Sequence, residues 1–436
     1  MTKRKAEMAL ATKVLKATFR PGDNGRSRSH AFMYGRKGAS SWESCGGTEV
    51  HYDERLMLEA AFLAREIGAP YLQKVPVDTI LNLCRNLISE NYIIWADETF
   101  LAEFNTSYFD FVSESSLIEF SREIKESEVF KPSQLLFVFP IQTVCIEEEY
   151  QGENYKLINP KSLNDIKNPI DISSFGIEAN LFPPSKRLSN RFYPFSSWLC
   201  VTSPHIKEAQ KNKAAILATL SLKYKYGLRY QFNMVRHIGG YCSFGKDMTN
   251  VIGDSHTPSV SQDINVTKID LPALKMLDYL LSSSEKEDKR KIKALEYLYR
   301  AWFLDESERF PFLFMCLESL YGDADNATQS IIDGIKSAVT INVPDTRLRL
   351  LIKLRGSIVH GRAPEIYDSR KYSQYYKRYN ICPSRDLGIL VAACINFTVF
   401  KCLIMEQQDE HQAIIDKAKA EGKLNDFIDH SIMASE

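Results

Sequence analysis

The sequence has no net charge, no closely spaced pair of cysteines and no hydrophobic run of membrane-spanning length. Lys plus Arg and Asp plus Glu each total 55, so no global field attracts the chain to nucleic acid, and any such binding must come from local patches. None of the nine cysteines forms a C-x-x-C motif, which argues against a zinc knuckle or a redox pair, and nine are too sparse for a disulfide scaffold. A reducing, cytoplasmic location is therefore expected.

The uncharged, mostly apolar stretch from Leu387 to Phe400 has 14 residues. A membrane-spanning helix needs about 20, so we expect a buried core helix here and no membrane contact. The sequence also lacks an H-E-x-x-H motif and a G-x-S-x-G elbow. We therefore expect no metal site, no cofactor and no serine-hydrolase chemistry.

The composition is that of a folded chain of two or three domains, with 436 residues, 44% of them hydrophobic and 25% charged. We predict an α+β fold in three parts. Residues 1–40 form a basic flexible segment, 41–265 a mixed α/β sensor or regulatory domain, and 266–436 an all-α helical bundle with an acidic C-terminal tail.

These boundaries rest on charge and on hydrophobic periodicity. Residues 1–40 hold ten Lys and Arg against two acidic residues, which is typical of a solvated tail or linker. The run QLLFVFPIQTVCI and the prolines that recur from 132 to 204 indicate strands and loops. Helical periodicity predicts helices over 53–67, 77–91, 206–222, 272–283, 286–303, 306–321, 326–339, 344–360, 384–406 and about 409–421.

The most informative segment is TRLRLLIKLRGSIVHG, residues 346–361. On a helix, the neighbours of Arg355 one turn away on either side are apolar, so this permanently charged side chain needs an anionic partner or a polar cleft. His360 falls at the helix end, with Gly361 suited to the position after the cap. A helix C-terminus favours the imidazolium, which places His360 to titrate near neutral pH.

Glu318, in FLFMCLESLYG, is a second charged residue among apolar helical neighbours. One interpretation is structural: Glu318 and Arg355 form a buried ion pair between two helices, and His360 only caps its helix. The other is that these residues form a catalytic or binding site.

The segment RGSIVHG, with its R-x-x-x-x-H spacing at the end of an apolar helix, resembles the ribonuclease motif of HEPN domains. RFPFLFMCLESLYGD, residues 309–323, resembles the preceding helix in the Apea-like branch of that superfamily, and the likeness covers about 270–405. It implies a HEPN-like bundle that forms a homodimer, with two motifs facing one cleft, and metal-independent RNA cleavage. The implied roles are acid/base for His360, phosphate clamp for Arg355 and orientation of Arg355 for Glu318.

The same resemblance implies a toxin-like or antiphage role, an abortive-infection response in which cleavage of cellular RNA such as tRNA halts translation. An N-terminal domain that binds an unidentified trigger would restrain such a nuclease. The chain departs from the family at Gly356, where many HEPN nucleases carry Asn or Asp, although Ser357 follows. The alternative is therefore a non-catalytic HEPN-like dimer that binds RNA or protein.

Basic and aromatic residues are concentrated around and after the motif. Nine Lys and Arg lie between 347 and 378, interleaved with tyrosines, so cations can neutralise phosphates while rings stack on unpaired bases. The predicted RNA-binding residues are Arg349, Lys353, Arg362, Arg370, Lys371, Tyr372, Lys377 and Arg378. The competing interpretation is a solvated basic loop whose tyrosines pack inward.

GYCSFGKD, residues 240–247, matches the first part of a P-loop. Asp247 stands where a P-loop places the Ser or Thr that ligates magnesium. A glycine-rich turn is the favoured interpretation, and nucleotide chemistry at Lys246 is the minor one.

Overall fold

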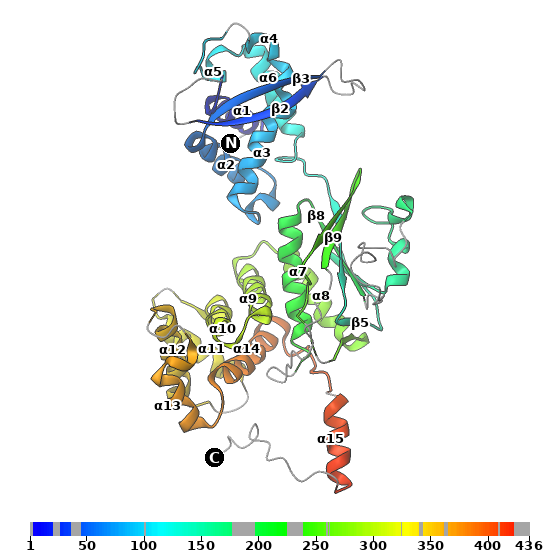
Figure 1. Ribbon diagram of the computed structural model, residues 1–436, viewed down its shortest axis with the longest axis vertical. Coiled ribbons are helices and arrows are strands. Elements are labelled where there is room, and N and C mark those ends of the chain that lie inside the picture. Colours follow the sequence, from blue (N-terminus) through cyan, green and yellow to red (C-terminus); the bar gives the residue numbers. More distant parts are fainter. Residues whose placement is uncertain are drawn as a thin grey trace. The chain divides into compact units, whose positions relative to one another are not determined.

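The computed structural model describes residues 3–20, 27–35, 45–99, 102–176, 197–224, 239–258, 260, 262–323, 325–339, 343–361, 365–408 and 410–422. The chain divides into two compact units, which we call the N-terminal unit (Met1–Gln134 with Pro204–Glu208) and the C-terminal unit (Leu135–Ser203 with Ala209–Glu436). The predicted α+β class is confirmed, since helices are combined with antiparallel sheets (Figure 1). The units divide between Gln134 and Leu135, whereas the sequence placed the boundary near 265.

The N-terminal unit contains a small antiparallel sheet with the strand order β1-β3-β2. Its elements are α1 (Lys3–Ala17), β1 (Thr18–Phe19), β2 (Ser27–Gly35), β3 (Cys45–Asp53), α2 (Glu54–Ile67), α3 (Val77–Asn91), α4 (Ala96–Thr99), α5 (Tyr108–Phe111) and α6 (Glu114–Glu126). The predicted helices over 53–67 and 77–91 are confirmed. Helix α2 begins after Asp53, whose carboxylate accepts a hydrogen bond from the Leu56 amide at 2.9 Å.

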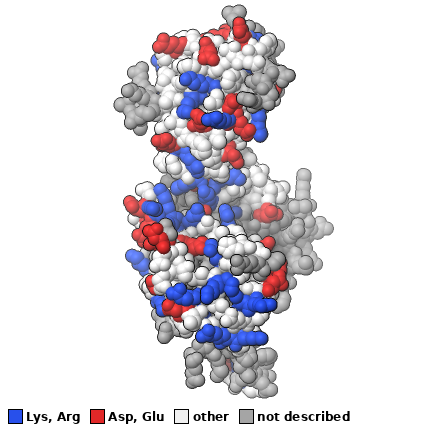
Figure 2. Space-filling view, turned by 90° about the vertical axis from the view of Figure 1, so that its left-hand side faces the viewer, with Lys and Arg blue, Asp and Glu red and all other residues white. Residues whose placement is uncertain are grey.

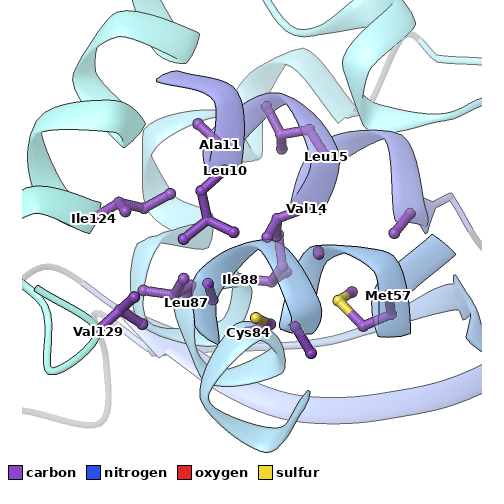
Figure 3. Packing of buried hydrophobic residues seen from close by; sticks show 14 of the residues in the cluster. Leu10, Ala11, Val14, Leu15, Met57, Cys84, Leu87, Ile88, Ile124 and Val129 are labelled. Carbon is purple, nitrogen blue, oxygen red and sulfur yellow. The ribbon is translucent and has the colours of Figure 1, made fainter. Parts of the chain in front are cut away.

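The prediction of a flexible segment over 1–40 was wrong for its first part, because α1 lies in the core of this unit. Leu10, Ala11, Val14 and Leu15 are fully buried and pack with α2, α3 and α6 (Figure 3). These apolar residues repeat at helical spacing, while Lys13 lies on the opposite, solvated side of the helix. The prediction was based on the high content of Lys and Arg in residues 1–40 and overlooked this periodicity. Residues 21–26 and 36–40 lie outside the described part of the chain.

The C-terminal unit contains a six-stranded antiparallel sheet with the order β10-β9-β4-β8-β7-β6, and a short parallel pair β11-β5. Its strands are β4 (Leu135–Ile141), β5 (Val144–Ile146), β6 (Tyr150–Gln151), β7 (Tyr155–Ile158), β8 (Ser197–Ser203), β9 (Gly239–Phe244), β10 (Met248–Gly253) and β11 (Ile264–Val266).

Both faces of the central strand β4 are covered, which explains why its sequence is continuously apolar rather than alternating. Leu136 and Val138 pack against the turns of residues 163–175. Phe139, on the other face, lies near α7 (Ile206–Ser221), where the Lys213 ammonium is 5.3 Å from the ring centre. The sheet is thus held between the 163–175 segment and helices.

Helices form the rest of the C-terminal unit. They are α8 (Leu271–Ser282), α9 (Lys286–Phe303), α10 (Glu306–Tyr321), α11 (Ala327–Ala338), α12 (Asp345–Val359), α13 (Arg370–Tyr379), α14 (Pro383–Phe400) and α15 (Glu410–Ala420). The Tyr155 hydroxyl donates to the Leu274 carbonyl at 2.9 Å, which ties the sheet to α8, and the Tyr299 hydroxyl of α9 donates to the His256 carbonyl at 2.8 Å. Sheet and bundle are therefore one compact unit rather than two domains.

A buried amine lies at this junction. The Lys213 ammonium is 3.0 Å from Nδ1 of His256 and has no carboxylate partner among the described residues. Burial lowers the pKa of Lys213 to about 8, and burial together with Lys213 lowers the pKa of His256 to about 3. The imidazole is therefore neutral, and its Nδ1 accepts a hydrogen bond from the Lys213 amine.

Two helices of the C-terminal unit differ from the prediction. The one expected over 384–406 is α14, which ends at Phe400 because Lys401 adopts a left-handed conformation with φ of 52°. Among the described residues it is the one helix apolar and long enough to cross a membrane, but 61% of it is buried inside the protein, as predicted for a core helix. Helix α13 was not predicted, because its ten residues are almost all polar or aromatic.

We predict that Leu10→Ala lowers the free energy of unfolding of the N-terminal unit by about 3 kcal/mol, because it leaves a cavity at a fully buried position. Lys13→Ala is the matched control and should cost less than about 1 kcal/mol, since its ion pair with Glu59 is solvated. Urea unfolding curves measure both. Equal values for the two variants would show that α1 is not part of the core.

Candidate functional site

Helix α12 carries the R-x-x-x-x-H motif and ends where the sequence predicted. The His360 amide donates to the Gly356 carbonyl at 3.2 Å and the Gly361 amide to Ile358 at 3.0 Å. Gly361 has φ of +67°, a conformation that side chains disfavour, so a glycine ends this helix at little cost.

The structure brings Arg355 and Glu318 together across α12 and α10. The guanidinium Nη2 lies 2.8 Å from Oε1 of Glu318, and the two side chains are 31% and 34% exposed. The Nε of Arg355 is buried and has no hydrogen-bond partner among the described residues. The pair expected from either interpretation is present, but it faces solvent over about a third of its surface and is not sealed in the core.

His360 is not brought to this pair within one chain. Its side chain is exposed and forms no hydrogen bond or ion pair with a described residue. Residues five apart on a helix point roughly 140° away from each other, so Arg355 and His360 leave α12 in different directions. A phosphate held by Arg355 would therefore meet an imidazole more readily if the imidazole came from a second chain.

Ser357 does not supply the polar group that Gly356 lacks. Ser357 is buried between α12 and α13, where its hydroxyl donates to the Lys353 carbonyl at 3.2 Å and accepts from Lys371 at 2.8 Å. Nothing lies within 4 Å of the position that a Cβ would take at Gly356. The helix therefore has room for a side chain beside Arg355.

A second ion pair, which the sequence did not reveal, fixes the first half of α12. Arg347 binds Asp386 of α14 through two hydrogen bonds of 2.8 and 2.6 Å, and the Tyr375 hydroxyl of α13 also donates to Asp386. The Arg347 and Asp386 side chains are 15% and 4% exposed. Burial, followed by the adjacent Asp386, raises the pKa of Tyr375, so the phenol stays protonated. Two residues that the sequence grouped with the basic and aromatic surface are thus structural.

Glu306, at the start of α10, anchors the segment before α13. The Tyr367 hydroxyl donates to its carboxylate at 2.5 Å, and the Cys382 thiol donates to the other oxygen. Burial and the carboxylate raise the pKa values of Cys382 and Tyr367. No sequence pattern linked these residues, because 61 and 76 positions separate the partners.

Four of the predicted RNA-binding cations are free and form what we call the basic surface: Lys353, Arg370, Lys377 and Arg378. All four are exposed, and none forms an ion pair or hydrogen bond through its side chain with a described residue. Figure 2 looks onto the side of the molecule where α12 and α13 lie in Figure 1 and shows bands of Lys and Arg there. The segment is therefore not the solvated loop of the competing interpretation but a helix, with Tyr376 also exposed on it and Tyr375 packed inward.

The other predicted RNA-binding residues are engaged elsewhere. The Lys371 ammonium donates to the Lys353 carbonyl at 3.2 Å and to Ser357, Tyr372 donates to the Cys382 sulfur at 3.6 Å, and Arg349 donates to the Gln329 amide oxygen at 2.7 Å. Arg362 lies outside the described residues.

Two further expectations concern nucleotide and metal chemistry. Residues 240–247 form the end of β9 and a turn into β10, with the Gly245 amide donating to the Asp247 carbonyl at 3.2 Å. A P-loop must lead into a helix N-terminus, so the predicted glycine-rich turn is confirmed and a P-loop at Lys246 is excluded. Within the described residues, no group of His, Cys, Asp and Glu could hold a metal ion.

Comparison of the chain with protein-family models, with curated proteins and with solved structures found no match. The resemblance to HEPN ribonucleases is therefore an interpretation of the R-x-x-x-x-H motif and of the sequence around Glu318.

The basic surface yields a prediction for RNA binding. Lys353→Ala, Arg370→Ala and Lys377→Ala should each reduce the slope of log K against log salt by about 0.7, because each removes one phosphate contact to single-stranded RNA. Lys289→Ala, at an exposed lysine of α9, is the control and should leave the slope unchanged.

Lys371→Ala tests whether Lys371 has a structural role rather than a role in RNA binding. It should lower stability by about 1 kcal/mol through the lost hydrogen bonds between α12 and α13 and change the salt slope little. Fluorescence anisotropy over a salt series measures the slopes. Identical slopes for all these variants and the wild type would remove the basic surface as an RNA site.

Proposed function

We propose that the chain is a metal-independent endoribonuclease of the HEPN type. The observation that carries the proposal is the Arg355–Glu318 pair, one-third exposed, on the helix that ends at the free imidazole of His360 and beside the basic surface. A pair exposed to this extent contributes less than about 1 kcal/mol to stability. Stability alone therefore gives little reason to place an arginine among apolar neighbours at this point.

The chemistry needs only groups that this chain has. The RNA 2′-oxygen attacks the adjacent phosphorus while its proton passes to an imidazole, and the P–O5′ bond breaks as the 5′-oxygen gains a proton. The products are a 2′,3′-cyclic phosphate and a 5′-hydroxyl. Arg355 would stabilise the charge on the phosphorane, and Glu318 would hold the guanidinium in place. One imidazole can serve as base or as acid, and two can serve as both.

A homodimer through the helical bundle would provide the second imidazole. It would also solve the geometric problem within one chain, where Arg355 and His360 leave α12 in different directions. The rival function is a HEPN-like dimer that binds RNA or protein without cleavage, and Gly356 together with the separation of Arg355 from His360 favours it.

In this proposal the N-terminal unit and the sheet restrain the nuclease and respond to a trigger. A toxin-like or antiphage role in the cytoplasm, with tRNA or other cellular RNA as target, follows from the resemblance to the HEPN family.

We predict that His360→Ala and Arg355→Ala each reduce RNA cleavage by about 10²- to 10⁴-fold, because each removes a group that acts on the reacting phosphate. The assay uses total RNA and tRNA in EDTA, with chemical mapping of the ends. The wild type should leave 2′,3′-cyclic phosphates. Lys289→Ala, an exposed position on α9, controls for effects of substitution and purification and should retain full activity.

The two functions give different outcomes in this assay. If the chain is a binding module, neither the wild type nor the site variants cleave RNA, and the affinity for RNA is unchanged in His360→Ala. Cleavage that persists in both site variants would overturn the nuclease proposal.

Mixing tests whether the site is shared. If Arg355 of one chain acts with His360 of another, co-expression of the Arg355→Ala and His360→Ala chains should restore activity, because their heterodimer keeps one intact pair. A site within one chain predicts no recovery. Co-purification through two different tags isolates the heterodimer for the assay.

A further inference from the structure

A cleft away from the Arg355–Glu318 site lies where the sheet meets α8. Its volume is about 600 Å³, within the usual range for small-molecule sites. It is lined by the β6–β7 hairpin (residues 150–156), the turn at 168–169, Thr202 of β8 and the outer face of α8 from Lys275 to Ser282.

The hairpin wall is held rigidly by Asp278 of α8. Its carboxylate accepts hydrogen bonds from the backbone amides of Glu153 and Asn154 at 2.9 and 3.0 Å, and from the Tyr150 hydroxyl at 3.1 Å. The Asn154 side chain adds bonds to Asp278 and to Ser282. A Cβ at Gly152 would overlap the same carboxylate, so the hairpin can approach α8 this closely only with a glycine. The cleft is therefore preformed.

Three kinds of side chain in the cleft bear on its ligand. Lys156 comes from β7 and Lys275 from α8, and neither forms an ion pair or hydrogen bond through its side chain with a described residue. The ring of Tyr279 is 66% exposed. The carboxylate of Glu153 is exposed, whereas that of Asp278 is saturated by its hydrogen bonds.

These groups match the parts of one class of ligand. Two unpaired ammonium groups suit a phosphate, an exposed tyrosine ring suits stacking of a planar base, and a free carboxylate suits the hydroxyls of a ribose. A simple anion would use only the lysines and would be repelled by Glu153. We propose that this cleft binds a nucleoside phosphate. The inference is independent of the proposed nuclease function, and it does not involve Lys246.

The experiment is calorimetric titration of the full chain at physiological ionic strength with the 5′-mono- and triphosphates of adenosine, guanosine, cytidine and uridine, and with inorganic phosphate. At least one nucleotide should bind with a Kd below about 1 mM, more tightly than phosphate. Lys156→Ala and Lys275→Ala should each weaken it about tenfold or more. Tyr279→Ala should weaken the nucleotide and leave phosphate binding unchanged.

Lys289→Ala, on the neighbouring helix, is the matched control and should bind as the wild type does. His360→Ala should also bind normally, so a failure of the nuclease proposal does not affect this test. The inference is overturned if no nucleotide of the panel binds below about 1 mM, if phosphate binds as tightly as every nucleotide, or if the control variant loses affinity to the same degree.

Discussion

Helix α12 is held to its neighbours by two arginines, Arg347 and Arg355, which stand a little over two turns apart. Arg347 is buried with Asp386 and Tyr375. Removing one partner of such a buried pair typically destabilises a protein by about 3–5 kcal/mol. Arg355 meets Glu318 at a surface that water reaches. The buried pair thus fixes the position of α12, and this leaves the exposed pair available to act on a ligand.

The same anchoring decides which cations are exposed to solvent. Tyr375 and Lys371 attach α13 to the rest of the bundle, so they cannot also contact a ligand. Arg370, Lys377 and Arg378 of α13 are exposed to solvent, as is Lys353 of α12. A charged helix with little apolar surface is stabilised here by specific polar contacts, which explains why its basic side chains lie in a defined arrangement.

The sheet and the helical bundle share one core, which bears on how a regulated nuclease could be built from this chain. Polar contacts at Tyr299, Lys213 and His256 join α9 and α7 to the sheet, and Asp278 joins α8 to the β6–β7 hairpin. A ligand in the cleft beside Asp278 would therefore contact the sheet and the first helix of the bundle at once. A ligand in the cleft can influence the Arg355–Glu318 site only if it binds two conformations of the protein with different affinities. Cleavage assays with and without the ligand can test for this effect.

The sequence by itself determined most of the longer helices and the ion pair at the motif. Helices α9 and α10 coincide with their predicted ranges, because amphipathic periodicity and end signals are local. Arg355 needed an anion, and Glu318 was the charged residue of a similarly apolar helix. Tertiary structure alone decided that α1 joins the core, that α13 is a helix, and that Arg347 is structural. Asp386 is 39 residues from Arg347, so no local pattern could reveal this pair, whereas the apolar spacing of α1 was present in the sequence among its many basic residues.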